Sequence, residues 1–288
     1  MNFEAGSLFP RLHSLEKDFT RSEKKVVEAV LDNPEEVLYS SITDLAEKAG
    51  VGDTTVVRFC RKVGFKGYQD FKMFLAGELS AGNGDDLNIL STKLEKDDDI
   101  DTIIQKIINT NMKALKDTAA LLNTKDIEAA VSLIEQSRSI YFYGSGISGH
   151  TAADARNTFL RVGLSVNALN DPHMQAMSAA LLTPEDLAIA ISHSGSSKDT
   201  IETLRIAKES GAKTICITHY SKSPITKYAD IILLSGHKEG PLQGGALTTK
   251  IAQMFVIDIL YTEYCRRNPE KAALSREKAA RAVSEKLY

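Results

Sequence analysis

The sequence is poor in cysteine and has no long apolar stretch. The three cysteines of the 288-residue chain lie far apart, at Cys60, Cys216 and Cys265. This spacing fits neither a disulfide framework nor a metal-binding knuckle. No apolar run approaches the roughly 18 residues that a membrane-spanning helix needs, and the first residues lack the basic and then apolar layout of a secretion signal. We therefore expect a cytoplasmic protein with no membrane segment.

The charge is unevenly distributed. The formal net charge of −3 does not by itself favour binding to nucleic acid. Residues 1–53 contain six Lys or Arg and eleven Asp or Glu, whereas residues 54–77 contain five basic residues and one acidic residue. A short basic stretch inside an acidic protein is typical of a surface that contacts phosphates, although a solvated helix face has the same composition.

The chain divides into three zones. Residues 1–77 consist of short helical segments with frequent capping residues and predict an all-α domain. Residues 78–101 are acidic and weakly apolar and predict a linker. Residues 102–288 alternate apolar strand-like runs with amphipathic helices. This alternation predicts a doubly wound α/β domain, whose parallel sheet is covered on both faces.

Local signals locate the helices of the first zone. Residues 20–23 (TRSE) match a capping box, and Ser41 begins a second helix whose apolar residues repeat at helical spacing. That helix is expected to end at Gly50, where the turn needs a positive φ. A further helix is expected over about Asp53–Val63.

The spacing of three small or apolar residues relates the last two helices to each other. Ala46 is small where two helices must cross closely, and Gly50 follows four residues later in the turn. Val56 then packs the second helix back on the first. This is the helix-turn-helix pattern, whose second helix enters the major groove of DNA, although any two adjacent helices share part of it.

The outer face of the second helix supplies the candidate DNA contacts. We expect Thr54 and Thr55, at the helix start, to meet phosphates or base edges. Arg58 is the best candidate for a base contact, because its guanidinium can pair with guanine. The remaining cations are expected to hold phosphates, which positions the domain without reading sequence; they are Arg61, Lys62 and Lys66. Surface charges that serve solubility are the alternative.

Three runs of this zone resemble the N-terminal domain of the RpiR/MurR family of transcription regulators. They are SITDLAEKAGV (residues 41–51), TTVVRFCRK (54–62) and GFKGYQDFK (64–72). The resemblance implies that operator DNA is a partner. Family members often have serine where this chain has Gly52, so we expect Asp53 to take over the capping of the second helix.

A glycine-rich loop follows the first expected strand of the third zone. Residues 139–143 predict a buried strand, and GSGISG (residues 144–149) leads from it into a helix. Backbone N–H groups and the helix dipole make such a turn an anion site. The loop also spells the dinucleotide fingerprint G-x-G-x-x-G, and Asp171 lies just past the next strand. A redox repressor that senses NAD(H) is therefore an alternative.

A serine-rich loop follows the third expected strand. Residues 187–191 predict that strand, and SHSGSSKDT (residues 192–200) leads into the next helix. Its serines offer hydroxyl donors to a phosphate at the carboxyl end of the strand, where ligands of open α/β sheets bind. A flavodoxin-like strand order places the first and third strands side by side, so that both loops converge on one phosphate. Helix capping and turn formation are the other roles open to these serines.

The two loops, within residues 130–265, resemble the SIS (sugar isomerase) domain, which is known for binding phosphorylated sugars. An SIS domain behind an RpiR-type helix-turn-helix is the architecture of that regulator family. The resemblance implies that serines of both loops hold the phosphate and that two glycines let the backbone approach it. These residues are Gly146, Ser148, Ser192, Ser194, Gly195 and Ser197.

The sequence therefore predicts a DNA-binding regulator of carbohydrate metabolism genes whose DNA affinity a phosphorylated sugar modulates, with no cofactor. A homodimer or homotetramer is expected, because helix-turn-helix proteins usually read two half-sites. The apolar helix over residues 251–261 is expected either at that interface or in the core.

An SIS-type sugar-phosphate isomerase is the main alternative from another class. Isomerisation needs a positioned base that moves a proton between carbons. The candidates for such a base are Glu239, His193, His219 and His237. No acid and base stand at a telling spacing and the six histidines are scattered, so we predict neither an enzyme nor a metal site.

Overall fold

The structure is a computed structural model of the chain. It describes residues 8, 11–12, 15, 18–81, 92, 94–241 and 247–284, and every statement below concerns these residues. The chain separates into two compact units, one made of residues 1–110 and 238–246 and the other of residues 111–237 and 247–288. Of the linker expected at 78–101, residues 82–91 and 93 lie outside the described part of the chain.

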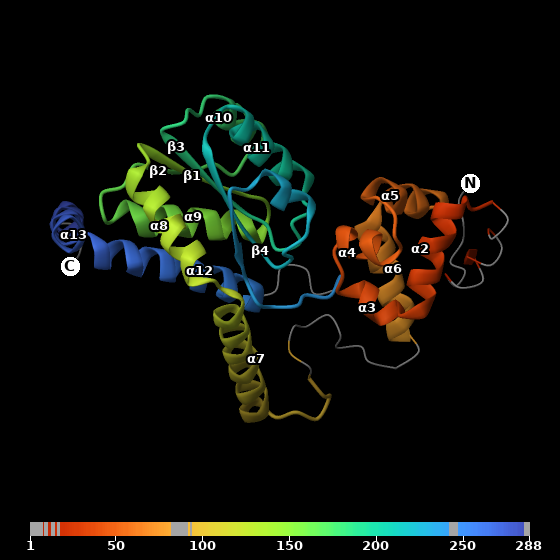
Figure 1. Ribbon diagram of the computed structural model, residues 1–288. Helices are drawn as coiled ribbons and strands as arrows, with labels where there is room; N and C mark the ends of the chain where they lie inside the picture. The colour runs from red at the N-terminus through yellow and green to blue at the C-terminus, as the bar shows by residue number, and fades with distance from the viewer. Residues whose placement is uncertain are drawn as a thin grey trace. The chain divides into compact units, whose positions relative to one another are not determined.

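The first unit contains a compact group of helices, drawn in red and orange in Figure 1. Its helices are α2 (Arg21–Asp32), α3 (Pro34–Leu38), α4 (Ile42–Lys48), α5 (Asp53–Lys62) and α6 (Tyr68–Ala81). The helix-turn-helix expected from the sequence is formed by α4, the turn at Gly50 and α5. Gly50 has a φ of +60°, a conformation that glycine adopts without the steric cost other residues incur.

Side-chain caps start the helices where the sequence predicts. Both α2 and α4 begin with a complete capping box, formed by Thr20 with Glu23 and by Ser41 with Asp44. In each box a hydroxyl accepts from one backbone N–H and a carboxylate accepts from another, so two otherwise unpaired donors are satisfied. The prediction for both helix starts is confirmed.

Aromatic packing holds the helices of this unit together. The ring of Phe59 on α5 is fully buried, and its centroid lies 5.9 Å from that of Phe19 and 5.5 Å from that of Phe71 on α6. Val26 and Val30, four residues apart on α2, are also fully buried. One face of α5 is thus committed to the core, which leaves its opposite face for solvent or a partner.

The second unit is built on a five-stranded sheet. Its strands are β1 (Ser139–Gly144), β2 (Val166–Ala168), β3 (Asp186–Ile191), β4 (Lys213–Thr218) and β5 (Ile231–Leu234). All pairs are parallel, in the order β2-β1-β3-β4-β5. This is the flavodoxin-like order, with β1 beside β3. The expected doubly wound α/β fold is confirmed.

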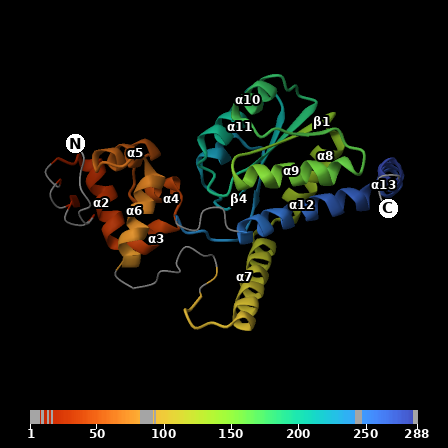
Figure 2. The same ribbon diagram turned by 180° about the vertical axis from the view of Figure 1, so that it is seen from behind.

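Helices cover both faces of the sheet, as Figures 1 and 2 show. One face carries α8 (Thr124–Gln136), α9 (Ile147–Leu160) and α12 (Leu247–Arg267). The other carries α10 (Pro172–Ala180), α11 (Lys198–Glu209) and the short 3-10 helix η1 (Pro224–Tyr228). Strand residues alternate between the two cores: Ile140 and Phe142 pack under α9, whereas Tyr143 packs under α10 and α11. This alternation follows from the two-residue repeat of a strand.

The long helix α12 is mainly a core element. Val256, Ile257 and Leu260 are almost completely buried in the core between the sheet and its helices. Of the two places expected for the helix over 251–261, the core is therefore the one observed for these side chains. The described part of the chain holds no helix that is both long and apolar enough to cross a membrane.

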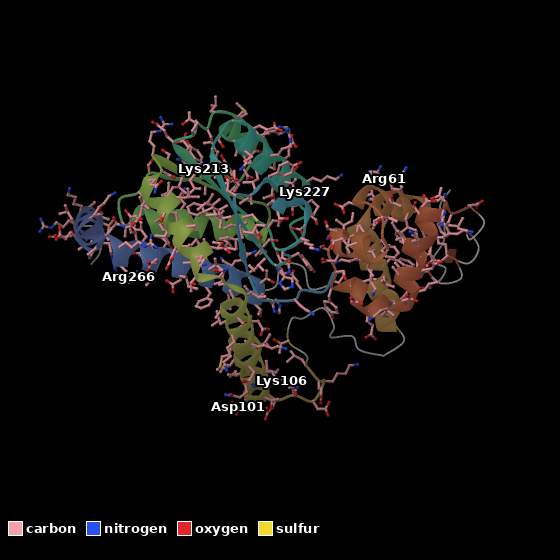
Figure 3. All side chains as sticks on the ribbon, in the orientation of Figure 1. Arg61, Asp101, Lys106, Lys213, Lys227 and Arg266 are labelled. Carbon is pink, nitrogen blue, oxygen red and sulfur yellow. The ribbon has the colours of Figure 1, made fainter. Side chains whose placement is uncertain are left out.

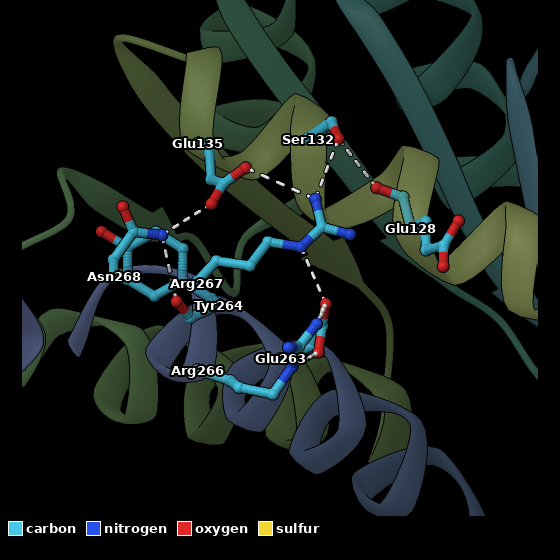
Figure 4. Close-up of polar contacts among 8 residues, drawn as sticks. All are labelled: Glu128, Ser132, Glu135, Glu263, Tyr264, Arg266, Arg267 and Asn268. Carbon is cyan, nitrogen blue, oxygen red and sulfur yellow. Dashed lines mark hydrogen bonds and ion pairs between the residues drawn. The ribbon is translucent and has the colours of Figure 1, made fainter.

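A polar cluster fastens α12 to α8 (Figure 4). Nη1 of Arg267 on α12 donates to Ser132 Oγ at 3.1 Å and lies 3.5 Å from Glu135 Oε2, both on α8. Nε of Arg267 donates to Glu263 at 2.8 Å. Hydrogen bonds from Arg266 and Arg267 lower the pKa of Glu263 to about 2. The cluster orients α12, whose other end reaches the glycine-rich loop after β1.

Two further long helices are described. They are α7 (Ile100–Leu121), which precedes α8, and α13 (Pro269–Ser284), which follows α12. Thr118 of α7 is fully buried, and its hydroxyl accepts from the backbone N–H of Gly236 at 2.9 Å. This contact joins the C-terminal part of α7 to the segment that follows β5.

Candidate functional site

The outer face of α5 presents the basic residues expected to contact DNA. Thr54, Arg58 and Arg61 are exposed, as is Lys66 in the turn before α6. Figure 3 shows Arg61 on the outside of α5, pointing away from the core of its unit. The exposed cations belong to the basic stretch found in the sequence.

Thr55 is placed differently from the prediction. It is only 9% exposed, because it lies four residues before the buried Phe59 and so shares the inner face of α5. Thr54 and Thr55 are neighbours in the chain, but about 100° of helix rotation separates them. The structure therefore keeps Thr54 on the outer face and removes Thr55 from it.

The Lys62 ammonium group makes hydrogen bonds within the helical unit. Its Nζ donates to the Asp18 carbonyl at 2.6 Å and to Glu23 Oε2 at 2.8 Å. Burial acts to raise the pKa of Glu23, but hydrogen bonds from Lys62 and Thr20 outweigh it and leave that pKa lowered. Lys62 thus joins α5 to α2, and a DNA phosphate would have to compete with Glu23 for it.

The start of α5 also differs from the expectation. Gly52 occupies the N-cap position with an extended backbone and makes no side-chain capping hydrogen bond. Asp53 is the first residue within the helix, and its Oδ2 accepts a 3.3 Å hydrogen bond from Thr43 on α4. Asp53 therefore links the two helices of the motif from the first position within α5.

The glycine loop (residues 144–149) brings α9 tightly against the end of β1. Gly144 approaches α9 so closely that a Cβ there would lie 2.7 Å from the Ser148 carbonyl oxygen. Gly146 has a φ of +57° and caps α9 without a side-chain hydrogen bond. Unpaired backbone N–H groups at such a helix start are favourable partners for an anion.

The serine loop (residues 192–197) leads from β3 into α11. Gly195 has a φ of +59°, and a Cβ there would lie 2.1 Å from Ser223 Oγ. Ser194 Oγ accepts from the backbone N–H of Ser196 at 3.2 Å, which is a local turn contact. Ser197 occupies the N-cap of α11, yet its side chain makes no capping hydrogen bond. Turn formation therefore explains the hydrogen bonding of the Ser194 hydroxyl, whereas helix capping does not explain the Ser197 hydroxyl.

The sheet brings the two loops together. Gly144 at the end of β1 and Ile191 at the end of β3 are register partners, so both loops leave the same edge of the sheet side by side. The hydroxyls of Ser145 and Thr200 are 3.2 Å apart and connect the glycine loop to the first turn of α11. The flavodoxin-like strand order expected from the sequence is confirmed, and it places the two loops side by side.

Gln253 is a candidate site residue that sequence reasoning missed. It lies on α12, is fully buried, and its Nε2 donates to Ser148 Oγ at 3.2 Å. Its Oε1 accepts from Thr151 Oγ1 at 3.0 Å. Because Ser148 Oγ is the acceptor in its bond with Gln253, the Ser148 hydroxyl hydrogen can still be donated to a ligand. A glutamine within the apolar run 251–261 was the available signal.

Two buried serine hydroxyls at the same edge make no hydrogen bond within the described structure. They are the Oγ atoms of Ser192, which is 3% exposed, and Ser235, which is 1% exposed. Buried hydroxyls are normally paired, and an unpaired one calls for an explanation such as a missing ligand or water. Ser192 was predicted from the sequence, whereas Ser235 was not.

Asp171, the acidic residue of the dinucleotide alternative, is used as a helix cap. It precedes α10, and its Oδ1 accepts from the backbone N–H of Met174 at 2.9 Å. A ribose-binding carboxylate would need its oxygens directed at the ligand. The capping contact is an ordinary structural role, and it weakens the case for a dinucleotide.

The histidines considered as bases gather along the same edge. His193 follows β3, His219 follows β4 and His237 follows β5. The rings of His193 and His219 are stacked with centroids 5.2 Å apart. Burial lowers the pKa of His237, and the charge of His219 adds to this effect. Within the part of the chain that the structure describes, no group of three or more His, Cys, Asp or Glu could hold a metal ion.

Comparison with known proteins identifies the two halves. A model described as the helix-turn-helix domain of the rpiR family matches residues 6–82, and a model of the SIS domain matches residues 133–263. The HTH-type transcriptional regulator RpiR of Escherichia coli K12 is 30% identical over 96% of this chain and 92% of its own. The chain belongs to the RpiR family. An uncharacterized HTH-type transcriptional regulator of Haemophilus influenzae is 40% identical to this chain, over 98% of both chains.

A solved structure supports the architecture along the whole chain. The Vibrio vulnificus NanR protein complexed with ManNAc-6P matches this RpiR-family regulator with a TM-score of 0.86 and 29% identity. The match covers 98% of this chain and 99% of that one. The fold of the helical unit, followed by an SIS domain, is therefore shared with that protein.

Proposed function

We propose that this regulator binds operator DNA through α4 and α5 and senses a phosphorylated sugar at the carboxyl edge of its sheet. The observation that carries the proposal is the meeting of two anion-favouring loops, because Gly144 and Ile191 are register partners and Ser145 contacts Thr200. A phosphate there would lie at the amino ends of both α9 and α11. It would also provide an acceptor for the unpaired Ser192 hydroxyl.

The ligand-binding residues proposed from the sequence keep distinct roles in this site. Gly146 and Gly195, both with positive φ, expose backbone N–H groups. The hydroxyls that donate to phosphate oxygens are those of Ser148, Ser192, Ser194 and Ser197. That NanR was solved with ManNAc-6P supports a phosphorylated amino sugar as the first ligand class to test.

Binding of the sugar changes the affinity for DNA and thereby regulates carbohydrate metabolism genes. Coupling between two sites is worth typically about 1–3 kcal/mol. Two copies of the chain act together, since helix-turn-helix proteins usually read two half-sites. Light scattering with and without DNA checks this part, and a monomer in both conditions would contradict it.

A thermal-shift screen tests the ligand. The panel holds N-acetylmannosamine 6-phosphate, other hexose phosphates, their unphosphorylated parents and NADH. Binding at 100 times Kd adds about 2.7 kcal/mol of stability, so a phosphosugar should raise the melting temperature while its parent sugar does not. Ser192→Ala should reduce the shift. Ser139→Ala is the matched control, because Ser139 lies at the opposite end of β1 and contacts Ser165.

Two outcomes of the screen would favour the alternatives. A shift with NADH alone would overturn the phosphosugar proposal and favour a redox repressor. Conversion of the bound phosphosugar during prolonged incubation would favour an isomerase, which the regulator names of the relatives do not support.

The DNA surface is tested by salt dependence. We propose Arg58 as a base contact and Arg61, Lys66 and the competing Lys62 as phosphate contacts, with Thr54 at the helix start. Removing one phosphate contact should weaken binding to all sequences and reduce the slope of log K against log salt by about 1.

Arg61→Ala is the first variant for this test. Lys213→Ala removes the same charge from an exposed position of the other unit (Figure 3) and is the matched control. Equal slopes for wild type and Arg61→Ala would contradict the assignment of Arg61. Operator fragments come from selection of random DNA on the purified chain.

A further inference from the structure

Three histidines extend along the sheet edge, from the serine loop to β5. His193 belongs to the serine loop, and His219 and His237 follow the next two strands. Neighbouring strands lie about 4.8 Å apart, so this histidine row (His193, His219 and His237) covers roughly 10 Å of the edge. The row begins at the loop proposed to hold the phosphate and continues away from the glycine loop.

The row is held in place by backbone and aromatic contacts. The carbonyl of His193 accepts from the backbone N–H of His219 at 3.0 Å and from Thr218 Oγ1 at 3.2 Å. The two rings are stacked with an angle of 19° between their planes, and the rings of His219 and Tyr220 form a T-shaped pair with centroids 4.8 Å apart. These contacts position the imidazoles before any ligand arrives.

The geometry determines the tautomer of His219. Nδ1 of His219 lies 2.8 Å from the carbonyl oxygen of Ser235. A carbonyl can only accept, so Nδ1 carries the proton in both charge states of the ring. A further proton taken up by His219 must therefore go to Nε2.

The buried atoms around the row are short of polar partners. His237 Nε2 and the hydroxyls of Ser192 and Ser235 are buried and have no hydrogen-bond partner among the described residues. Ser192 lies beside one end of the row, and Ser235 and His237 lie at the other end. The edge thus has polar atoms without a partner at both ends of the row, which points to a bound group that spans it.

Burial and the neighbouring charges favour the neutral form of His237. Burial lowers the pKa of His237, as do His219 and Lys113 of α7, and Asp117 of α7 acts in the opposite direction. His193 and His219 face each other and Tyr220. Protonated rings of His193 and His219, whose centroids lie 5.2 Å apart, would repel each other, so a proton on one disfavours a proton on the other.

We propose that His193, His219 and His237 form a proton-linked anion subsite, which takes up one proton from water when an anionic ligand binds at the sheet edge. This inference rests on the proposed function. A nearby anion favours the charged form of an imidazole. By linkage, the anion then binds more tightly as the pH falls. The anion is either the phosphate of the sugar or a carboxylate at the far end of the same molecule.

The sign of the pH dependence of binding distinguishes protonation of the histidine row from protonation of the ligand itself. A phosphate monoester has its second pKa near about 6, so it loses charge on acidification and by itself predicts weaker binding. Sulfate keeps its charge over this range and is therefore the first probe. Bound sulfate is expected to raise the pKa of a histidine in the row. For each pH unit of this rise, the affinity for sulfate increases up to about tenfold as the pH is lowered from about 8 to about 6.

The experiment is a sulfate titration of the full chain, followed by NMR of backbone amides and of imidazole carbons. We expect several-fold tighter sulfate binding at the lower pH and a raised pKa for a histidine of the row. His219→Gln and His237→Gln should flatten the pH dependence. His173→Gln is the matched control, because His173 is exposed on α10 outside the row.

Each remaining outcome has a defined meaning. Sulfate that shifts the amides of residues 145–148 and 192–197 without changing any imidazole pKa, together with 6-phosphogluconate that binds without proton uptake, would refute the row and leave the proposed anion site standing. Failure of sulfate and of every phosphate ester to bind would refute the proposed function itself. Glucose 6-phosphate and 6-phosphogluconate identify the source of the anion: proton uptake with both assigns the phosphate, and uptake with 6-phosphogluconate alone assigns the carboxylate. Binding of both without uptake would refute the row.

Discussion

Replacing Gly144 by alanine tests how closely α9 must approach the end of β1. The added methyl group would lie 2.7 Å from the carbonyl oxygen of Ser148, 2.8 Å from its carbonyl carbon and 3.0 Å from the backbone nitrogen of Gly149. These are backbone atoms, so the first turn of α9 must move as a whole. Overpacking of this kind typically costs about 1–3 kcal/mol. We expect the upper half of this range, because no side-chain rotation can relieve the contact.

Gly146→Ala is the matched control in the same loop. A Cβ at Gly146 meets nothing within 4 Å, but the residue has a φ of +57°. The left-handed conformation costs an alanine roughly 1–2 kcal/mol, and the reduced entropy of the unfolded chain offsets about 0.4–1 kcal/mol of this. The net loss should therefore be smaller than that of Gly144→Ala.

Scanning calorimetry provides the assay, because it can separate the transitions of the two units. For a unit of this size about 2–4 °C are lost per kcal/mol, so Gly144→Ala, at about 2–3 kcal/mol, should lower the melting temperature of the α/β unit by about 4–12 °C. The transition of the helical unit should stay unchanged, and stabilisation of the α/β unit by inorganic phosphate should be reduced. A variant that melts like the wild type, or one less affected than Gly146→Ala, would refute the reasoning.

Three other contacts yield predictions of the same kind. Gln253→Leu removes the buried hydrogen bond to Ser148; we expect a loss of roughly 1–3 kcal/mol and a weaker response to phosphate in calorimetry, and a full response would contradict the positioning role of Gln253. Burial lowers the pKa of Lys72 from 10.5 to about 8. Because the unfolded chain then binds more protons between these values, the helical unit should gain up to roughly 3 kcal/mol as the pH rises through this window. Denaturant unfolding of Lys72→Met should lack this rise. The lowered pKa of Glu23 stabilises the helical unit above the ordinary glutamate pKa, and this stability is lost as the pH falls through the lowered value; Glu23→Gln should lose this part of the acid dependence, and an unchanged acid-unfolding curve would show that the Lys62 pair contributes nothing.

Short-range chemistry explains which parts of the fold were predictable. The capping boxes that start α2 and α4 join residues three apart, and the turn at Gly50 depends on the φ of one residue. The strands of the sheet show as apolar runs because both of their faces are buried. Each of these signals lies within a few residues, so the sequence alone locates the elements and, through their order, the fold class.

Candidate site residues could be named from the sequence where they belong to a loop with its own signature. The glycine and serine loops each follow a strand and precede a helix, so residues such as Gly146 and Ser192 could be named in advance. Thr55 was misplaced because the boundary between the inner and outer faces of a helix cannot be read from one residue type. Its burial follows from its position one turn before Phe59.

Contacts between distant parts of the chain were decided by the tertiary structure. Gln253 bonds to Ser148 across 105 residues, and the hydroxyls of Ser145 and Thr200 meet across 55. No local pattern specifies such partners, because they depend on how α12 and α11 pack on the sheet. The alignment of three histidines arises in the same way, from strands that are consecutive in the chain and adjacent in space.

By itself the sequence determined the two kinds of domain, the helix starts, the strand runs and the family. The reason is that helix and strand propensity, capping and hydrophobic periodicity each depend on only a few neighbouring residues. The tertiary structure alone decided that Thr55 faces the core, that Lys62 is shared with Glu23 and that Gln253 supports Ser148. These outcomes depend on packing and on competition between partners far apart in the chain, which become defined only when the helices and the sheet are assembled.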